Sequence, residues 1–330
     1  MGEEKENVSP TFEFRNSLTA RWGSHMRFLF ALCLATLLSV PTFCATVPEG
    51  IVKTVVFIYR GQNGAAGQPD GTGFLVGLPN TSHPGQSWLY LVTAKHVLHT
   101  DPNNISSPMY PDLFVRINKK SGGSQVFRLP ITDSGDKQSV FFSPDSSVDV
   151  AVFPIGIPNA DQFDVVFLPE DMLVTRADFA KYKIGIGTDT FFTGMFTPVL
   201  GQSKNIPIVR FGRLAMLPDE KIPWGTESID AYLVETFSFG GNSGSPVFFY
   251  PSADNTPGMM VLGPAVIKIA GVMKGFFGDL EPITMAQTAS TGQQIPASQQ
   301  NSGIAIVIPA EHIREILDSP ELASKRQPAP

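Results

Sequence analysis

A run of glycine, serine and asparagine stands between two apolar segments in TFSFGGNSGSPVFFY, residues 236–250. Glycine allows backbone conformations that other residues avoid, so this run predicts a tight turn around Ser243. A serine in such a turn is either an ordinary turn residue or, with a base in reach, a nucleophile for acyl transfer. Ser243 can be a nucleophile only if another part of the chain places a base beside it.

Two further residues could complete such a site. His96 follows the apolar segment WLYLVTA in VTAKHVL, where a rigid strand would aim the imidazole at a cleft; the alternative is a capping or surface histidine. Asp149 begins an apolar segment in SSVDVAVFPI. A buried carboxylate is costly unless a cation or hydrogen-bond donors satisfy it, so we expect a partner such as an imidazole N–H. The alternative is an aspartate bonded to its own turn at the start of a strand.

The elements that must position these residues are short strands. Segments rich in β-branched and aromatic residues recur past residue 50, separated by Gly, Pro, Asn and Asp, which predicts an all-β sandwich or barrel. Helical spacing is seen in PAEHIREILDS, so we expect a C-terminal helix over 310–318 and a disordered tail over 319–330. The strand segments are TVVFIY, GTGFLVGL, WLYLVTA, LFVRIN, DVAVFPI, VVFLPE, IPIVRFGRLA, AYLVETF, SPVFFY, PAVIKIAGVM and GIAIVIP.

Composition excludes several classes of protein. Hydrophobic residues make up 42% of the chain and charged residues 16%, with 25 Phe, which is enough apolar material for a large core. The net charge is -6, and no basic cluster lies beyond residue 45, so we expect no nucleic-acid partner. Only His96 and His99 stand at metal-ligand spacing with carboxylates nearby, and His96 is better used beside Ser243. We expect neither a metal nor another cofactor, and a monomeric protein.

The first 45 residues resemble a leader rather than part of the fold. MRFLFALCLATLLSVPTFCA begins at Met26, continues with an apolar stretch and ends in small residues, which is typical of a secretory signal peptide. The alternative is a membrane anchor, which the helix-breaking Pro41 disfavours. Residues 1–25 carry four Glu and do not resemble the start of a signal peptide, so we expect Met26 to be the true start.

Cleavage of this leader determines the compartment and the redox chemistry. Both cysteines, Cys33 and Cys44, lie within it, so a cut after Cys44 or Ala45 leaves no thiol for a disulfide, a nucleophile or a metal site. We expect an exported protein, periplasmic or extracellular, that leaves the membrane after cleavage.

Five motifs stand in a recognisable order: GTGFLV, LVTAKHV, DVAVFPI, GGNSGSPVF and GVMKG. Together they resemble the successive signatures of the trypsin-like (chymotrypsin-fold) serine peptidases over about residues 50–318, and GGNSGSPVF is similar to the bacterial branch that includes glutamyl endopeptidases. The α/β-hydrolase alternative fails, because Ser245 replaces the glycine of its elbow and only His312 follows the serine.

The resemblance implies a peptidase domain over 46–318. Its fold would be two six-stranded antiparallel Greek-key β-barrels, the first at about 50–158 and the second at about 163–309. The active site would lie in the cleft between the barrels, and the terminal helix would follow at 310–318.

The resemblance also implies a secreted serine endopeptidase acting on polypeptides. Ser243 would attack a peptide carbonyl, His96 would take its proton, and Asp149 would hold the imidazole tautomer. Backbone N–H groups of Gly241 and Ser243 would form the oxyanion hole. Asn242 carries no charge to pair with an N-terminal ammonium, so we expect this hole to form on folding. A catalytically silent binding protein and a β-sandwich with a chance serine turn remain alternatives.

The specificity residues implied by the resemblance depart from those of the family. Phe237, with Ser238 beside it, stands where trypsin-like enzymes carry the acidic base of the primary pocket. Met273 stands where glutamyl endopeptidases use a histidine, and Lys274 could assist an acidic side chain. Met273, Lys274 and Gly275 would pair with an extended substrate through their backbones, unless they are ordinary strand residues. We expect a medium-sized apolar side chain in the pocket.

Overall fold

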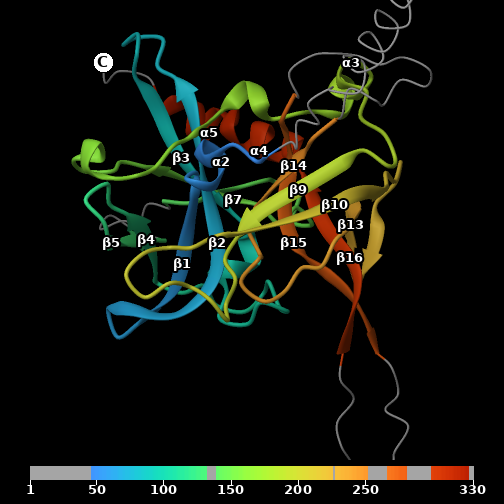
Figure 1. The fold of residues 1–330 in the computed structure, drawn as a ribbon, viewed down its shortest axis with the longest axis horizontal. Coiled ribbons are helices and arrows are strands. Elements are labelled where there is room, and N and C mark those ends of the chain that lie inside the picture. Colours follow the sequence, from blue (N-terminus) through green and yellow to red (C-terminus); the bar gives the residue numbers. More distant parts are fainter. Residues whose placement is uncertain (1–45, 132–138, 226, 252–265, 281–298, 327–330) are drawn as a thin grey trace, which may run out of the picture. The chain divides into compact units, whose positions relative to one another are not determined.

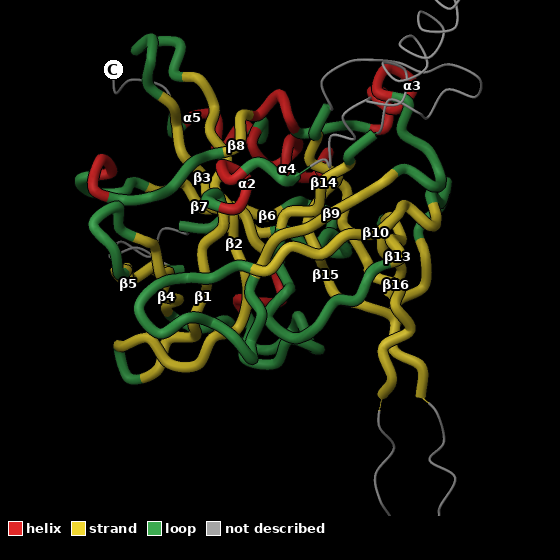
Figure 2. Tube along the Cα trace, in the orientation of Figure 1, coloured by secondary structure: helices red, strands yellow, loops and turns green. Residues whose placement is uncertain are grey.

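The computed structural model describes residues 46–131, 139–225, 227–251, 266–280 and 299–326. The leader and signal peptide expected over 1–45 lie outside the described residues. Within the described ranges, no helix has the length and apolar character needed to cross a bilayer. Figure 2 shows strands and loops over most of this part of the chain, with short helical segments at the connections.

The first half of the described chain forms an eight-stranded sheet (blue to green in Figure 1). Its hydrogen-bonded order is β5-β4-β1-β2-β3-β7-β6, and β8 pairs with β2 in parallel. The strands are β1 (Val55–Gln62), β2 (Ala65–Pro79), β3 (Ser87–Thr93), β4 (Asp112–Asn118), β5 (Ser124–Pro130), β6 (Phe141–Phe142), β7 (Ala151–Ile155) and β8 (Leu168–Pro169).

The second half forms a closed antiparallel barrel in the order β10-β13-β16-β15-β14-β9. A separate hairpin, β11 (Ile222–Trp224) with β12 (Glu227–Ile229), is inserted between two of its strands. The barrel strands are β9 (Asp189–Gly194), β10 (Ile208–Met216), β13 (Tyr232–Glu235), β14 (Pro246–Phe249), β15 (Lys268–Leu280) and β16 (Gln299–Pro309).

The prediction of two closed six-stranded barrels is therefore correct for one half only. Among the described residues, the edge strands β5 and β6 of the first sheet do not pair with each other. β6 is two residues long because the chain then enters a turn, in which Asp145 N–H bonds the Ser143 hydroxyl and the Asp145 carboxylate accepts from Ser147 N–H. A strand this short cannot close the sheet.

Helical segments occupy the connections and the C-terminal end. The expected C-terminal helix is α4 (Ala310–Leu317), and it is followed by α5 (Pro320–Ser324), where the sequence predicted a disordered tail. Ser319 caps α5 by accepting from Leu322 N–H, and the Leu322 side chain is buried, which explains why these residues fold. The other segments are α2 (Glu49–Val52), α3 (Phe179–Tyr182), η1 (Lys95–Leu98), η2 (Ala160–Gln162), η3 (Glu170–Met172) and η4 (Arg176–Asp178).

One hydrophobic core joins the two halves. Leu91 and Val152 from the first sheet and Phe248 and Ile308 from the barrel belong to the same buried cluster, and Ile313 of α4 closes it. α4 contacts β7 as well as β15 and β16. Because protein interiors are close-packed, this shared core fixes how the two halves meet.

We predict that Ile313→Ala lowers the free energy of unfolding by about 2–5 kcal/mol, since the side chain is fully buried and its removal leaves a cavity between the halves. Denaturant unfolding followed by circular dichroism measures this. Asp318→Ala, at the exposed end of the same helix, should change the free energy by less than about 0.5 kcal/mol. Equal effects of the two substitutions would contradict a core that joins the halves at α4.

Candidate active site

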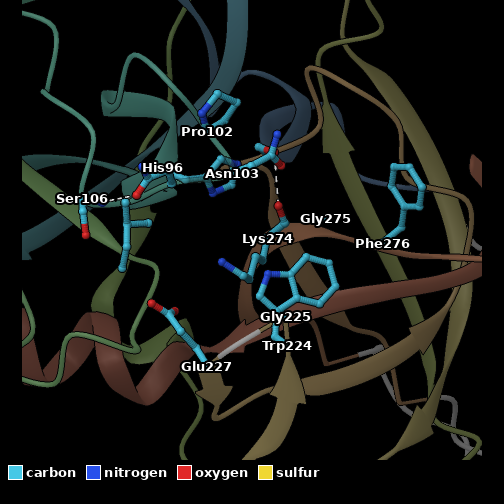
Figure 3. Close-up of a pocket in the computed structure, with 13 residues that line it drawn as sticks. His96, Pro102, Asn103, Ser106, Trp224, Gly225, Glu227, Lys274, Gly275 and Phe276 are labelled. Atoms are coloured by element: carbon cyan, nitrogen blue, oxygen red, sulfur yellow. Dashed lines mark hydrogen bonds between the residues drawn. The ribbon is translucent and has the colours of Figure 1, made fainter.

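Three residues predicted from the sequence converge on one cleft. His96 lies on η1, directly after β3, and Asp149 stands two residues before β7. Ser243 lies in the turn between β13 and β14. His96 and Ser243 line the same cavity, of about 760 Å³, between the first sheet and the barrel. Figure 3 shows His96 beside Pro102, Asn103 and Ser106 on one side, with Lys274, Gly275 and Trp224 on the other.

His96 and Asp149 form a close buried pair. His96 Nδ1 lies 2.7 Å from Asp149 Oδ2, and the backbone N–H of His96 donates to Oδ1 at 2.9 Å. An ionised carboxylate can only accept, so Nδ1 carries the hydrogen and Nε2 keeps its lone pair. The arrangement fixes both the tautomer and the direction of the ring, which is what a general base requires.

The Asp149 carboxylate has a second partner, a cation, that the sequence did not reveal. Lys274 Nζ donates to Asp149 Oδ2 at 2.8 Å. Burial opposes ionisation of this carboxyl, but the nearby charges and hydrogen bonds of His96 and Lys274 outweigh it and hold the pKa of Asp149 well below its ordinary value. The one signal in the sequence was that a buried Asp149 needs a cation or donors; nothing pointed to Lys274 as that cation.

The turn that carries Ser243 is held by the first sheet. Thr72 of β2 donates its N–H to the Ser243 carbonyl at 2.8 Å. Gly244 has φ +84°, and a Cβ there would lie 2.0 Å from the Thr72 carbonyl oxygen and 2.3 Å from Thr93 Oγ1. Glycine is therefore required at position 244, and the sharp turn predicted around Ser243 is confirmed.

The Ser243 hydroxyl donates to the Lys274 carbonyl at 3.2 Å (Figure 3). The same residue thus contacts Ser243 through its backbone and Asp149 through its side chain. Hydrogen bonds between catalytic groups are often long in a free site and shorten when substrate binds, so this contact is compatible with a later one between Ser243 and His96.

Two threonine hydroxyls donate to backbone carbonyls in the segment just before Ser243. Thr197 Oγ1 donates to the Gly240 carbonyl at 2.7 Å, and Thr72 Oγ1 donates to the Gly241 carbonyl at 2.8 Å. In a trans peptide the C=O and N–H point in opposite directions, so the bond from Thr197 turns the Gly241 N–H the other way. Within the described part of the chain, the N–H groups of Gly241 and Ser243 donate to no backbone carbonyl. Neither N–H is therefore committed to a backbone carbonyl of the described residues.

Asn242 fixes this loop without any charged partner. The side chain is buried, its Oδ1 accepts from Phe239 N–H at 2.8 Å, and its Nδ2 donates to the Met195 carbonyl. The backbone N–H of Asn242 also donates to the Phe239 carbonyl at 2.9 Å. The Asn242 amide therefore bonds neighbouring backbone groups, and the expectation that this loop takes its shape on folding stays a prediction.

Of the five residues assigned to substrate binding, the structure brings two to the cavity. Lys274 and Gly275 line it, whereas the Met273 side chain is fully buried in the barrel core. Phe237 stacks on Phe239 and lines a separate surface hollow.

Ser238 is buried, and its carbonyl accepts from Asn301. Phe237 and Ser238 therefore do not form the base of this cavity, because the turn directs one outward and packs the other inward.

Two loops that the sequence did not single out form much of the cavity wall. The segment 102–106 follows His99, whose Nδ1 donates to the Ser107 carbonyl at 2.6 Å. The hairpin β11–β12 contributes Trp224 and Glu227, and Lys221 at its start pairs with Asp145 at 2.6 Å. These loops had no motif because their role depends on where the fold places them.

Strand β15 offers a free edge to the cavity. Its pairing with β14 runs from Lys268 to Val272, and Met273 N–H still bonds the Ser245 carbonyl. Beyond Met273, Lys274 stands at a shift in the register with β16, Gly275 and Phe276 pair with β16 alone among the described strands, and all three line the cavity. An exposed edge of this kind can add an extended peptide as a further strand.

The described residues contain no group of three His, Cys, Asp or Glu side chains placed to hold a metal ion. His312, on α4, bonds Asp230 and Glu315 instead. The cleft therefore offers a hydroxyl, a positioned imidazole, a buried carboxylate and two N–H donors, the set that nucleophilic acyl transfer uses.

Comparison with known proteins gives distant likenesses only. No family model and no curated protein matches the sequence. The MamO protease domain from Magnetospirillum magneticum matches over 82% of this chain and 99% of its own, with 14% identity and a TM-score of 0.47. Rv3671c from M. tuberculosis, in an inactive form, matches over 87% and 98%, with 15% identity and a TM-score of 0.40. Human heparin binding protein matches over 87% and 98%, with 9% identity and a TM-score of 0.42. Conclusions about function therefore depend on the site's own geometry.

We predict that Thr197→Val slows the reaction of Ser243 with a fluorophosphonate by about tenfold, because the Gly240 carbonyl loses its donor and the Gly241 N–H loses its direction. The second-order rate constant from quenched time points measures this. Thr197→Ser keeps the hydroxyl and should react at close to the original rate. If Thr197→Val and Thr197→Ser react equally, Thr197 does not orient this peptide.

We also predict a pH-dependent difference in stability. The pKa of Asp149 is lower in the folded chain than in the unfolded chain. Its carboxylate therefore stabilises the fold above the unfolded pKa of about 3.9, and this stabilisation is lost as the pH falls towards the folded pKa. Between about pH 2 and pH 4 the free energy of unfolding should therefore rise more steeply with pH in the unmodified chain than in Asp149→Asn. Denaturant titrations at each pH measure the slope; an exposed control, Asp318→Asn, should keep the original slope.

Proposed function

We propose that this chain is a trypsin-like serine endopeptidase that hydrolyses peptide bonds through His96, Asp149 and Ser243. The proposal rests on one observation: His96 Nδ1 lies 2.7 Å from the buried Asp149 carboxylate while His96 and Ser243 line the same cavity. The three residues come from separate segments that only the fold brings together. A chance serine turn in a β-sandwich does not account for this convergence.

The proposed reaction begins at the hydroxyl of Ser243. Its Oγ attacks the carbonyl carbon of the scissile peptide and its proton moves to His96 Nε2. The carbonyl oxygen becomes an oxyanion, which the N–H groups of Gly241 and Ser243 stabilise, and Asp149 stabilises the imidazolium. When the tetrahedral intermediate collapses, the C–N bond breaks, His96 protonates the departing amine, and an acyl-enzyme remains.

Water completes the cycle by the same steps. His96 removes a proton from water, whose oxygen attacks the acyl carbon, and a second oxyanion forms in the same place. Collapse breaks the bond between the acyl carbon and Ser243 Oγ, releases the amino-terminal fragment with its new carboxyl group, and returns the proton from His96 to Ser243. The products are two shorter peptides. One water molecule is consumed, and the enzyme returns to its starting form.

The substrate we propose is a polypeptide bound in extended form. The free edge of β15 from Lys274 to Phe276 can pair with its backbone, which presents successive side chains to the cavity walls. We further propose that the protein is exported, on the basis of the signal-like segment that begins at Met26; that it is monomeric remains a prediction from the sequence. The link of GGNSGSPVF to glutamyl endopeptidases and the preference for an apolar side chain remain predictions from the sequence.

A catalytically silent binding protein is the second candidate. It is favoured by the contact between the Ser243 hydroxyl and the Lys274 carbonyl and by the sharing of Asp149 between His96 and Lys274. In that case the cleft would bind peptides and leave them intact.

A fluorophosphonate probe separates the two candidates. We expect the purified chain to be phosphonylated at Ser243, with mass spectrometry locating the adduct, and to release new α-amino groups from an unfolded protein substrate. Ser243→Ala should abolish both reactions, and His96→Ala should slow labelling by at least about a thousandfold.

Ser245→Ala serves as the matched control, because this neighbouring hydroxyl is buried and has no partner among the described residues. It should be labelled at close to the rate of the unmodified chain. Absence of labelling in folded, unmodified protein would contradict the proposed peptidase and favour the silent alternative, as would labelling that survives His96→Ala.

A further inference from the structure

Two donors share one oxygen of the buried carboxylate. His96 Nδ1 lies 2.7 Å and Lys274 Nζ 2.8 Å from Asp149 Oδ2, while Oδ1 accepts from the His96 backbone N–H. The side chains of His96 and Lys274 are each 11% exposed and that of Asp149 is 4% exposed. The ammonium of Lys274 is thus a buried member of the same cluster and not a surface charge.

The contact between Lys274 and Asp149 determines the net charge of the cluster when His96 gains a proton. With a neutral imidazole, the ammonium already neutralises the carboxylate; adding a proton to His96 leaves the cluster with a net positive charge. Charges interact more strongly in a poorly solvated cleft than in water, so the second positive charge is disfavoured. Without Lys274, the same proton would neutralise a lone buried carboxylate and would be favoured.

The other charged groups around the cluster do not reverse this balance. Glu227 lines the cavity from the hairpin and is exposed, so water screens it. Asp145, on the turn before Asp149, is paired with Lys221. Lys95, beside His96, lies with its Nζ over the ring of Phe142.

The position of Lys274 is fixed at both ends. Its Nζ lies 5.8 Å from the centre of the Trp224 ring, which covers it from the hairpin, and its carbonyl accepts from Ser243 Oγ. β15 pairs with β16 on both sides of this position, at Met273 and at Gly275. The ammonium therefore stays with Asp149 because its strand and its cover hold it there.

We propose that Lys274 is a positioning residue that keeps Asp149 ionised and disfavours a proton on free His96, so that the site remains reactive at lower pH. The inference rests on the proposed peptidase function. Lys274 would act through Asp149 and His96, without touching the reacting atoms through its side chain.

The test compares the rate of fluorophosphonate labelling against pH in the unmodified chain and in three variants of Lys274. Lys274→Gln keeps a hydrogen-bond donor for Asp149 but removes the charge, Lys274→Met removes both, and Lys274→Arg keeps the charge. Unit charges about 5 Å apart at an effective dielectric constant of about 20 correspond to a shift of about two pH units. We expect the acidic limb of the profile to move upward by that amount in Lys274→Gln and Lys274→Met and to stay in place in Lys274→Arg.

Lys268→Met is the matched control. Lys268 lies on the same strand, and its Nζ donates to the Asp171 carbonyl, outside the cavity. Its profile should match that of the unmodified chain. An unshifted acidic limb in Lys274→Gln would overturn the inference, since that variant loses the charge and keeps a donor to the carboxylate; if Lys274→Met does not fold, Lys274→Gln decides alone.

A second measurement separates this inference from the proposed function. The pH at which the ring signal of His96 changes in NMR spectra, assigned with His96→Ala, should be higher in Lys274→Gln than in the unmodified chain. This readout needs no reactive serine. Loss of labelling in every protein together with the shift in the His96 signal would contradict the peptidase and support the role of Lys274; labelling without the shift would do the reverse.

Discussion

The carboxylate of Asp149 loses most of its water when the chain folds, and a buried charge is stable only if donors replace that water. Three donors do so: the backbone N–H and Nδ1 of His96, and Nζ of Lys274. His96 belongs to the first sheet and Lys274 to the barrel. Satisfying one carboxylate therefore requires both halves to be in place, and it fixes the imidazole at the same time.

A second connection between the halves shapes the backbone at Ser243. Thr72 of the first sheet bonds the carbonyls of Ser243 and Gly241, and it accepts from Met195 N–H of the barrel side. Gly244 packs so closely on Thr72 that no side chain fits there. The free N–H groups of the loop are thus a product of how the halves meet. The closed core between the sheets and α4 makes that meeting rigid.

Lys274 contributes to the charge of the cleft through its side chain and to the structure of the cleft through its backbone. Its carbonyl receives the Ser243 hydroxyl, its ammonium balances Asp149, and the strand that carries it continues into the free edge that faces the cavity. The hairpin with Trp224 covers this residue and is itself tied to the first sheet by the ion pair of Lys221 with Asp145. The charge of the site and the surface offered to a peptide consequently depend on the same few contacts.

The sequence by itself determined the strand-rich fold, the C-terminal helix and the turn at Ser243, because apolar periodicity and glycine-dependent turns are local properties. It also offered His96, Asp149 and Ser243 as candidates through a resemblance, but the fold was needed to bring them together. It did not determine that the first sheet stays open, that residues after Ser319 form a capped helix, or that Phe237 turns away from the cavity. Above all, it could not assign Lys274 to Asp149, 125 residues away. The tertiary structure decided that pairing, because a buried carboxylate is stabilised by the cation that the packed strands place beside it. The spacing of residues along the chain does not show which cation that is.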